Sequence, residues 1–484
     1  MLKKFSTLLL CFGLVACSTN RGSKVADHGG IQDFSSDISE INISSSDSFR
    51  VGMLLPLSGP ASRHGHGLRN AAMVALEDIN NPNLIVQFYD SKGTPEGART
   101  AIKNAISQKA DVIVGPLMST EVQAIANETI YQGVPVIAFS TAQEVLQPTV
   151  YTMGLLVEEQ VDRIMTYTAQ KGRSRFALLI PDNSTGNAVA RAALKSAHKN
   201  NVTVTIIGYY KPENSDFSAI IKEMTDYNTR HEAVVRKRAE LESLANEGNA
   251  SAALELKKLS SKEGIGDLGF DAVLIPESGA KLTSAISMFA YYDAAYPDVQ
   301  FLGTSIWETG KFNNEAAIVK SLYPAISRAY SSYFAGKYNS IFGERPSSLY
   351  SFAYDAIALT NQLSKQAPEN INQAITKPEG YFGINGAFRF FEDGSNQHSL
   401  DVVEIRSSGD VVVDAAPKNF SKDLFYEKLQ PLDFYDGFVA PKIYGKNKQS
   451  AEVAIFGSLL PEENEQTDEE KKLPEEINAE SVTE

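Results

Sequence analysis

Short apolar runs alternate with amphipathic segments from residue 49 to residue 151. Each run suits one buried strand and ends at a polar or Gly/Pro-rich turn, and each following segment has the apolar spacing of a helix. Parallel strands need such crossover helices, so the pattern predicts a doubly wound parallel α/β sheet. The expected strands are Val51–Leu55, Leu84–Tyr89, Asp111–Val114 and Pro135–Phe139, and the expected helices are Leu68–Ile79, Glu96–Gln108 and Glu121–Tyr131.

A second series of the same kind begins near Val157 and predicts a second lobe. Later helices and antiparallel strands indicate that the chain returns to complete both lobes. We expect lobe 1 at 49–155, completed by about 305–365, and lobe 2 at 156–304, completed by about 380–415. The expected elements are strands Phe176–Ile180, Val202–Ile207, Ala272–Ile275 and Gln300–Leu302, helices Gly186–Lys199, Phe217–Thr225, Lys281–Tyr292, Ile326–Ile341 and Leu349–Leu363, and late strands Gly386–Phe391, Ser399–Arg406 and Val411–Val413, followed by an extension at 416–460.

A charged segment at 226–266 interrupts the second lobe. Its Glu, Lys, Arg, Ala and Leu content predicts two helices, with a break at Asn246-Glu247-Gly248-Asn249. One interpretation is a solvated helical hairpin, because charges alternate with scattered apolar positions. The other is a docking arm, because long insertions are where partner contacts arise.

The first seventeen residues have the layout of a bacterial lipoprotein signal. Lys3 and Lys4 precede an apolar stretch that is too short to span a bilayer, and Leu14-Val15-Ala16-Cys17 after it resembles a lipobox. We expect a signal peptide at 1–16 and lipidation of Cys17. The alternatives are ordinary cleavage that leaves Cys17 as a free thiol, and a plain membrane anchor.

Two polar segments flank the predicted lobes. Residues 17–48 are rich in Ser, Asp, Gly and Asn, which predicts a flexible tether. Residues 461–484 are dominated by Glu and Asp, which predicts a disordered tail. Because Ser18, and not Asp, follows the lipobox cysteine, we expect the protein to face the periplasm from the outer membrane.

Composition narrows the classes of function. The chain has 484 residues, 43% of them hydrophobic, which is enough for two well-buried lobes. Its net charge of −14 argues against nucleic acid as a partner, since phosphate binding needs a basic face. Both cysteines, Cys11 and Cys17, lie in the predicted signal region, so no disulfide is expected once the signal is processed.

The sequence contains no catalytic or cofactor-binding motif. No nucleophile elbow, phosphate loop or dinucleotide fingerprint stands where catalysis would need it. His64 and His66 flank Gly65, but a metal site needs further ligands, so solvent-exposed loop histidines are expected. We therefore expect no catalytic residues, no metal and no cofactor, and a protein that is not an enzyme.

The order of motifs resembles a known family. VGMLLPLSGPASRHG, FYDSKGTPEGA, VIVGPLMST, GVPVIAFST and LLIPDNSTGNAVAR, taken together over about residues 50–415, resemble the type I periplasmic binding proteins of the leucine/isoleucine/valine-binding kind. Within that superfamily the chain looks most like the penicillin-binding protein activator lipoproteins. SKGTPEGA, GPLMS, the charged insertion before GFDAVLIPESG, and GYFGINGAFRFFEDGSNQHSLDVVEI carry this closer resemblance.

The resemblance implies a cleft between the lobes that is lined by strand-end groups. Ser119, Ser140 and Thr141 would hold the carboxylate of a small ligand, and Glu277 would hold its ammonium. An alternative for the three hydroxyls is that they only cap helices. Two expected aromatic walls are replaced, one by His64 and one by Ser184-Thr185. The cleft candidates are Ser58, in the turn after the first strand, together with His64, Ser119, Ser140, Thr141, Thr185 and Glu277.

Two functions are compatible with these features. The first is a non-enzymatic, lipid-anchored envelope protein that regulates peptidoglycan synthesis by binding a penicillin-binding protein. The second is a lipoprotein substrate-binding component of an ABC transporter for amino acids or a similar small polar solute. In both, the membrane contact is the lipid anchor. The replaced aromatic walls favour the first function.

Overall fold

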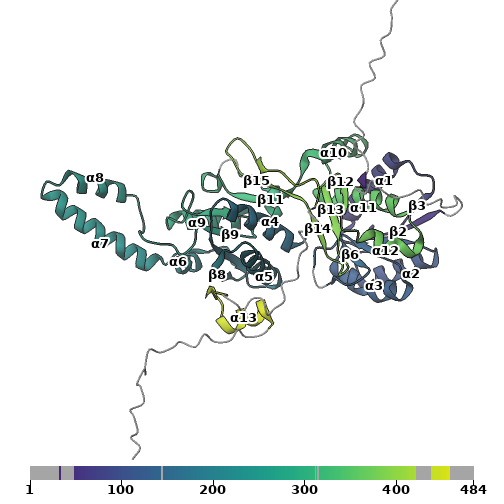
Figure 1. The fold of residues 1–484 in the computed structure, drawn as a ribbon, viewed down its shortest axis with the longest axis horizontal. Helices are drawn as coiled ribbons and strands as arrows, with labels where there is room; N and C mark the ends of the chain where they lie inside the picture. The colour runs from purple at the N-terminus through teal and green to yellow at the C-terminus, as the bar shows by residue number, and fades with distance from the viewer. Residues whose placement is uncertain are drawn as a thin grey trace, which may run out of the picture.

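The computed structural model describes residues 32–33, 48–142, 145–310, 312, 315–420 and 438–457. These residues form two lobes, each organised around a β-sheet (Figure 1). The predicted signal peptide at 1–16, the lipidation site Cys17 and the acidic tail at 461–484 lie outside the described residues.

Lobe 1 contains a five-stranded parallel sheet with strand order β3-β2-β4-β5-β6. The predicted α/β fold is confirmed, and one short strand, β6, was not predicted. It follows a turn that interrupts the apolar pattern after residue 140. The strands are β2 (Phe49–Leu55), β3 (Leu84–Asp90), β4 (Val112–Val114), β5 (Val136–Ala138) and β6 (Val150–Thr152), and the crossover helices are α1 (Ser62–Ile79), α2 (Pro95–Ser107) and α3 (Ser119–Gln132).

Helix α1 begins at Ser62, before the predicted start at Leu68. Gly65 and Gly67 lie inside this helix, where their lack of a side chain allows close approach to other parts of lobe 1. A Cβ at Gly65 would lie 2.1 Å from the carbonyl oxygen of Pro56, and one at Gly67 would lie 2.1 Å from the Tyr350 ring. The prediction that His64 lies in a loop is therefore wrong, because the residue is in the first turn of α1.

Replacing Gly65 by alanine should destabilise lobe 1. The added Cβ would meet backbone atoms that cannot rotate away, so we expect a loss of about 1–3 kcal/mol in the free energy of unfolding, measured in urea. Gly336 of α10 (Arg328–Phe342) is a matched control, since a Cβ there would meet no atom within 4 Å. Gly336→Ala should gain about 0.5–1 kcal/mol. Equal effects of the two substitutions would contradict the steric argument.

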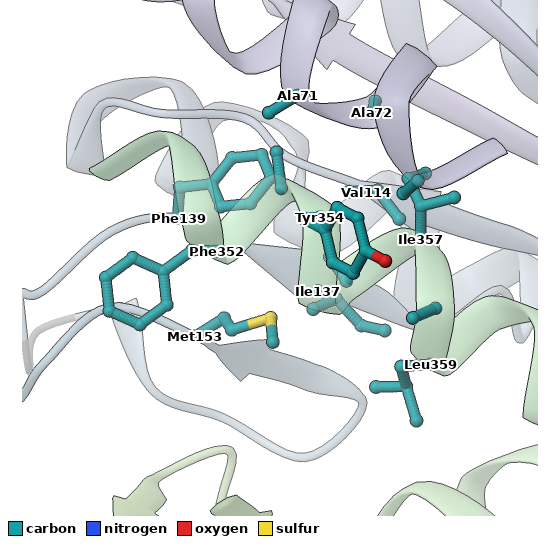
Figure 2. Packing of buried hydrophobic residues seen from close by; sticks show 14 of the residues in the cluster. Ala71, Ala72, Val114, Ile137, Phe139, Met153, Phe352, Tyr354, Ile357 and Leu359 are labelled. Atoms are coloured by element: carbon teal, nitrogen blue, oxygen red, sulfur yellow. The ribbon is translucent and has the colours of Figure 1, made fainter. Parts of the chain in front are cut away.

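The core of lobe 1 is completed by late parts of the chain. Helix α11 (Ser348–Leu363) packs against α1 and is buried along most of its length, as Figure 2 shows for Phe352, Tyr354, Ile357 and Leu359. A four-stranded sheet, with order β1-β12-β13-β14, adds Tyr381, Phe388 and Phe390 to the same core. Its strands are β1 (Gln32–Asp33), β12 (Tyr381–Gly383), β13 (Gly386–Phe390) and β14 (Asn396–His398), and helix α12 (Ile371–Ile375) precedes β12.

This sheet corrects two predictions. Residues 381–398 were expected in lobe 2, but their apolar side chains fill the core of lobe 1. Gln32 and Asp33 were expected in the tether, but they pair antiparallel with β12 through backbone groups. Neither pairing could be predicted from the side-chain pattern, because alternation of apolar and polar residues predicts a strand but not the strand beside it.

Lobe 2 contains an eight-stranded sheet with order β16-β15-β11-β10-β9-β7-β8-β17. Strand β11 was expected within the part that completes lobe 1, but it pairs with β10 and β15 in this sheet. The predicted extension supplies β17, which pairs parallel with β8, and α13. The elements are α4 (Val157–Gln170), β7 (Arg175–Pro181), α5 (Ser184–Lys199), β8 (Thr203–Tyr210), α6 (Ser218–Met224), β9 (Ala272–Leu274), α9 (Gly279–Tyr291), β10 (Gln300–Leu302), β11 (Leu322–Ile326), β15 (Leu400–Glu404), β16 (Val411–Asp414), β17 (Lys442–Tyr444) and α13 (Lys448–Phe456).

The insertion forms two antiparallel helices that project from lobe 2 (Figure 1). They are α7 (Tyr227–Asn246) and α8 (Ala250–Leu259), which we call the arm. The predicted pair of helices and their break are confirmed, and Gly248 supplies the positive φ of 94° that the turn uses. Val234, Leu241 and Ala252 are buried in the arm, whereas Val235 and Leu254 are exposed.

Within the described residues, three chain segments cross between the lobes. The first runs from β6 to α4, the second joins β11 to α10, and the third joins β14 to β15. Each crossing is short: the second contains only Ser327 between its two elements, and the third only Ser399. Short crossings let the lobes move relative to each other mainly by rotation of a few backbone angles.

Candidate functional site

In lobe 1, Ser58 lies in the turn after β2 and is held by Asp90 at the end of β3. The Ser58 hydroxyl donates to Asp90 Oδ2 at 2.6 Å, and the Leu57 and Ser58 amides donate to Oδ1 at 2.9 and 3.1 Å. Burial acts to raise the pKa of Asp90, but the hydrogen bonds from Ser58, Lys92 and Leu57 outweigh it and lower that pKa. This serine therefore already serves as a donor within the protein.

The three other hydroxyls of lobe 1 stand at the same edge of the parallel sheet. Ser119 is the first residue of α3, where Met118 occupies the N-cap position and Glu121 accepts from its amide at 3.0 Å. Ser140 is buried, and its hydroxyl accepts from the Ala142 amide at 3.1 Å within a turn. Thr141 is exposed. The capping alternative is therefore wrong for Ser119, because Met118 holds the N-cap position of α3.

His64 lies near the same edge, in the first turn of α1. Its ring is exposed and makes an edge contact with Tyr350, with ring centroids 6.3 Å apart. Among the residues that the structure describes, no group of three or more His, Cys, Asp or Glu side chains is placed to hold a metal ion.

Lobe 2 supplies Thr185 and Glu277 at the carboxyl ends of β7 and β9. Thr185 is exposed in the first turn of α5, where the Asn183 side chain caps the helix by accepting from the Gly186 amide at 3.0 Å. Glu277 accepts a short hydrogen bond from the Tyr210 hydroxyl at the end of β8. Burial, together with this bond to Glu277, raises the pKa of Tyr210. Tyr210 therefore stays protonated and remains a donor to Glu277 at neutral pH.

The structure thus brings the candidates into two groups. Ser58, His64, Ser119, Ser140 and Thr141 share the strand-end edge of lobe 1, and Thr185 with Glu277 share that of lobe 2. In the described part of the chain, no hydrogen bond or ion pair joins the two groups. Sequence reasoning missed Asp90 and Tyr210, the partners of Ser58 and Glu277. Asp90 could have been found, because it ends a strand and opens the turn Asp90-Ser91-Lys92-Gly93.

Comparison with known proteins identifies the family. A family model described as periplasmic binding protein matches residues 48–410. The chain belongs to the periplasmic binding protein family. This family of solute-binding proteins is generally non-enzymatic, and its members lie in the periplasm or outside the cell. No helix among the described residues is long and apolar enough to cross a membrane.

Individual members of the family are distant from this chain. The Leu/Ile/Val-binding protein BraC3 of Rhizobium johnstonii is 20% identical over 181 residues, which are 35% of this chain and 49% of that protein. The match therefore spans about half the length of that curated relative.

Two solved structures share the fold. An ABC transporter substrate-binding protein from Sphaerobacter thermophilus has a TM-score of 0.56 at 17% identity, covering 77% of this chain and 98% of that one. Full-length LpoA from Haemophilus influenzae has a TM-score of 0.55 at 17% identity, covering 77% of this chain and 60% of that one. At such identities the likeness is one of fold.

Proposed function

We propose that this family member is a non-enzymatic, lipid-anchored envelope protein that regulates peptidoglycan synthesis by binding a penicillin-binding protein. The sequence resemblance to penicillin-binding protein activators supports the process. The lipobox-like Leu14-Val15-Ala16-Cys17 supports the anchor, and Ser18 supports an outer-membrane location. Binding would shift the synthase between less and more active states.

The observation that carries the proposal is that several of the strand-end groups already form hydrogen bonds within the protein. An amino-acid site needs free donors for a carboxylate and a free acid for an ammonium. Here the Ser58 hydroxyl donates to Asp90, the Ser140 hydroxyl accepts from a backbone amide, and Glu277 accepts from Tyr210. Binding a carboxylate through the Ser58 hydroxyl would have to break its hydrogen bond to Asp90, and His64 and Thr185 provide no aromatic wall to offset that cost.

The arm offers a surface for a protein partner. It stands away from the sheet of lobe 2, and Val235 of α7 and Leu254 of α8 are 50% and 63% exposed. Charged residues surround these apolar side chains along both helices, as in an interface with a small apolar centre and a polar rim.

Calorimetric titration of the full chain in detergent tests the function directly. We expect no heat of binding with leucine, isoleucine, valine or muropeptides, and binding to a purified penicillin-binding protein from the same cell, with a change in its polymerisation rate. Tight binding of a free amino acid, with no effect on any synthase, would contradict the proposal.

Val235→Asp should weaken the complex with the synthase. A charge in the centre of a protein interface costs more than about 1.4 kcal/mol, so we expect at least about a tenfold rise in Kd. Val453 of α13 is a matched control, because it is the same residue type, lies in a helix and is 49% exposed. Val453→Asp should leave Kd unchanged, and equal effects of the two substitutions would exclude the arm as the contact.

A solute-binding role in transport is the second candidate. Glu277 favours it, because it stands after the third strand of lobe 2, where amino-acid receptors of this kind place an acid. The similarity to a Leu/Ile/Val-binding protein also favours it. If this role is correct, Glu277→Gln should abolish amino-acid binding in the titration above, while contacts with a synthase should be absent.

A further inference from the structure

Three buried titratable side chains gather where the lobes meet, and the proposed function uses none of them. Glu159 is in the first turn of α4, in lobe 2, whereas Asp355 of α11 and His398 of β14 belong to lobe 1. Their residues are 6%, 0% and 5% exposed. Helix α4 directly follows the first crossing and β14 directly precedes the third, so the cluster lies beside two of the three crossings, which together we call the hinge.

Glu159 forms hydrogen bonds both to the first crossing and to the strand that precedes the third. Its Oε1 accepts from the Leu156 amide in the first crossing at 2.9 Å. Its Oε2 accepts from the His398 amide at 2.6 Å, and the two carboxylate oxygens lie 3.2 and 3.3 Å from His398 Nδ1. Since a carboxylate only accepts, these distances assign the first ring proton of His398 to Nδ1.

The other ring nitrogen of His398 has no such partner. Nε2 is buried and makes no hydrogen bond within the described part of the chain. The ring is stacked on Phe388, with centroids 6.0 Å apart, and makes an edge contact with Phe352 at 5.6 Å. A second proton would therefore turn the ring into a buried cation beside two acids, with aromatic groups excluding water.

Asp355 is the second of these acids. It accepts from the Ile384 and Asn385 amides at 2.8 and 3.1 Å. Complete burial raises its pKa to about 7, against the opposing effects of these two hydrogen bonds and of the electrostatic influence of His398.

The remaining charged groups on the neighbouring elements are engaged elsewhere. On α4, Glu158 interacts with Lys195 and Arg191 of α5, and Arg163 binds Asp414 and the Leu400 carbonyl. Arg389 of β13 binds Gln397 and the Pro378 carbonyl. Asp401 of β15 accepts from the Ala416 amide. Glu159 and Asp355 are therefore the titratable groups that act on the His398 ring.

We propose that His398 is a proton-operated latch of the hinge: a second proton on its ring strengthens its attraction to Glu159 across the lobes and restricts their relative motion. The neutral ring offers Glu159 only a hydrogen bond, whereas the charged ring adds a Coulomb attraction in a poorly solvated site. Histidine is the side chain whose charge ordinarily changes between about pH 5 and pH 8. The lobes are thus held more firmly in acid, whichever partner or solute the protein binds.

The test measures the distance between the lobes as a function of pH. The chain has two cysteines, both in the first seventeen residues, so C11S/C17S provides a thiol-free full chain. Spin labels at Ser107→Cys on α2 and Glu223→Cys on α6, both exposed, report on lobe 1 and lobe 2. We expect the distribution of distances to narrow as the pH falls from about 8 to about 5. A distribution that does not depend on pH would overturn the proposal.

Variants assign the response to His398. His398→Gln keeps a hydrogen-bond donor for Glu159 but cannot gain charge, so the pH response should be lost. His231→Gln is the control, because His231 also contacts a glutamate residue, Glu263, but lies on the arm, and the response should remain. A response that survives in His398→Gln would overturn the proposal. If His398→Gln does not fold, Glu159→Gln decides: it removes the charge that attracts the protonated ring, so the pH response should be lost, and a response that survives would overturn the proposal.

Discussion

Replacing Trp307 by alanine is expected to lower the free energy of unfolding by about 3–5 kcal/mol. Trp307 is fully buried in the core of lobe 2 and lies against Phe312, with ring centroids 6.5 Å apart. A Cβ at Gly303 would lie 2.1 Å from the indole, so the backbone directly after β10 closely covers the ring. Truncation would leave a cavity that this backbone cannot fill without breaking strand pairing.

Urea unfolding followed by circular dichroism measures the loss. Trp307 Nε1 has no hydrogen-bond partner among the described residues, so the expected loss is one of packing. Trp307→Phe should therefore retain most of the stability, with a loss of about 1–3 kcal/mol for the smaller ring. If Trp307→Ala and Trp307→Phe lose equal amounts of free energy of unfolding, the cavity argument is wrong.

Asp355→Asn is expected to remove a large pH dependence of stability. The pKa of Asp355 is raised by burial from 3.8 to about 7 in the folded protein. Between these values the unfolded chain has released the proton and the folded protein still holds it, so stability falls as the pH rises. At about 1.4 kcal/mol for each pKa unit, this group alone lowers stability by about 4 kcal/mol between pH 4 and pH 8.

The difference in the free energy of unfolding between the parent protein and Asp355→Asn isolates the contribution of this carboxyl group. Urea unfolding at several pH values should show the stability of the parent falling relative to Asp355→Asn, with the change complete slightly above pH 7 and absent below about pH 4. A constant difference between parent and Asp355→Asn across this range would mean that Asp355 is ionised in the folded protein throughout.

The fold was largely predictable from periodicity, whereas the neighbours of each element were not. Apolar runs placed β2, β4 and β7 to within two residues, because each is a continuous buried run between turn residues. The start of α1 was missed, because the need for glycine at positions 65 and 67 comes from Pro56 and Tyr350, and Tyr350 lies almost 300 residues away in sequence. The strands at 381–398 were recognisable as strands, but only tertiary packing decides which core they fill.

The candidate site was predictable only in part. Strand ends could be located, so Ser58 and Glu277 were found. Whether Ser58 and Glu277 are free to bind a ligand depends on their hydrogen-bond partners Asp90 and Tyr210. Those partners lie on other strands, and the sequence does not show how the strands align. The cluster of Glu159, Asp355 and His398 left no signal in the sequence, since each lies in a different element and only the crossings bring them together.

The return of late chain segments to lobe 1 governs how the protein can be divided and how it folds. Helix α11 and strands β12 to β14 supply much of the lobe 1 core, so no continuous stretch from the first half of the chain contains that core. During synthesis the 347 residues before α11 are made before the helix that buries α1, so the apolar surface of lobe 1 stays exposed until α11 follows. Contacts between such distant segments slow folding, so the incomplete chain is a natural substrate for chaperones.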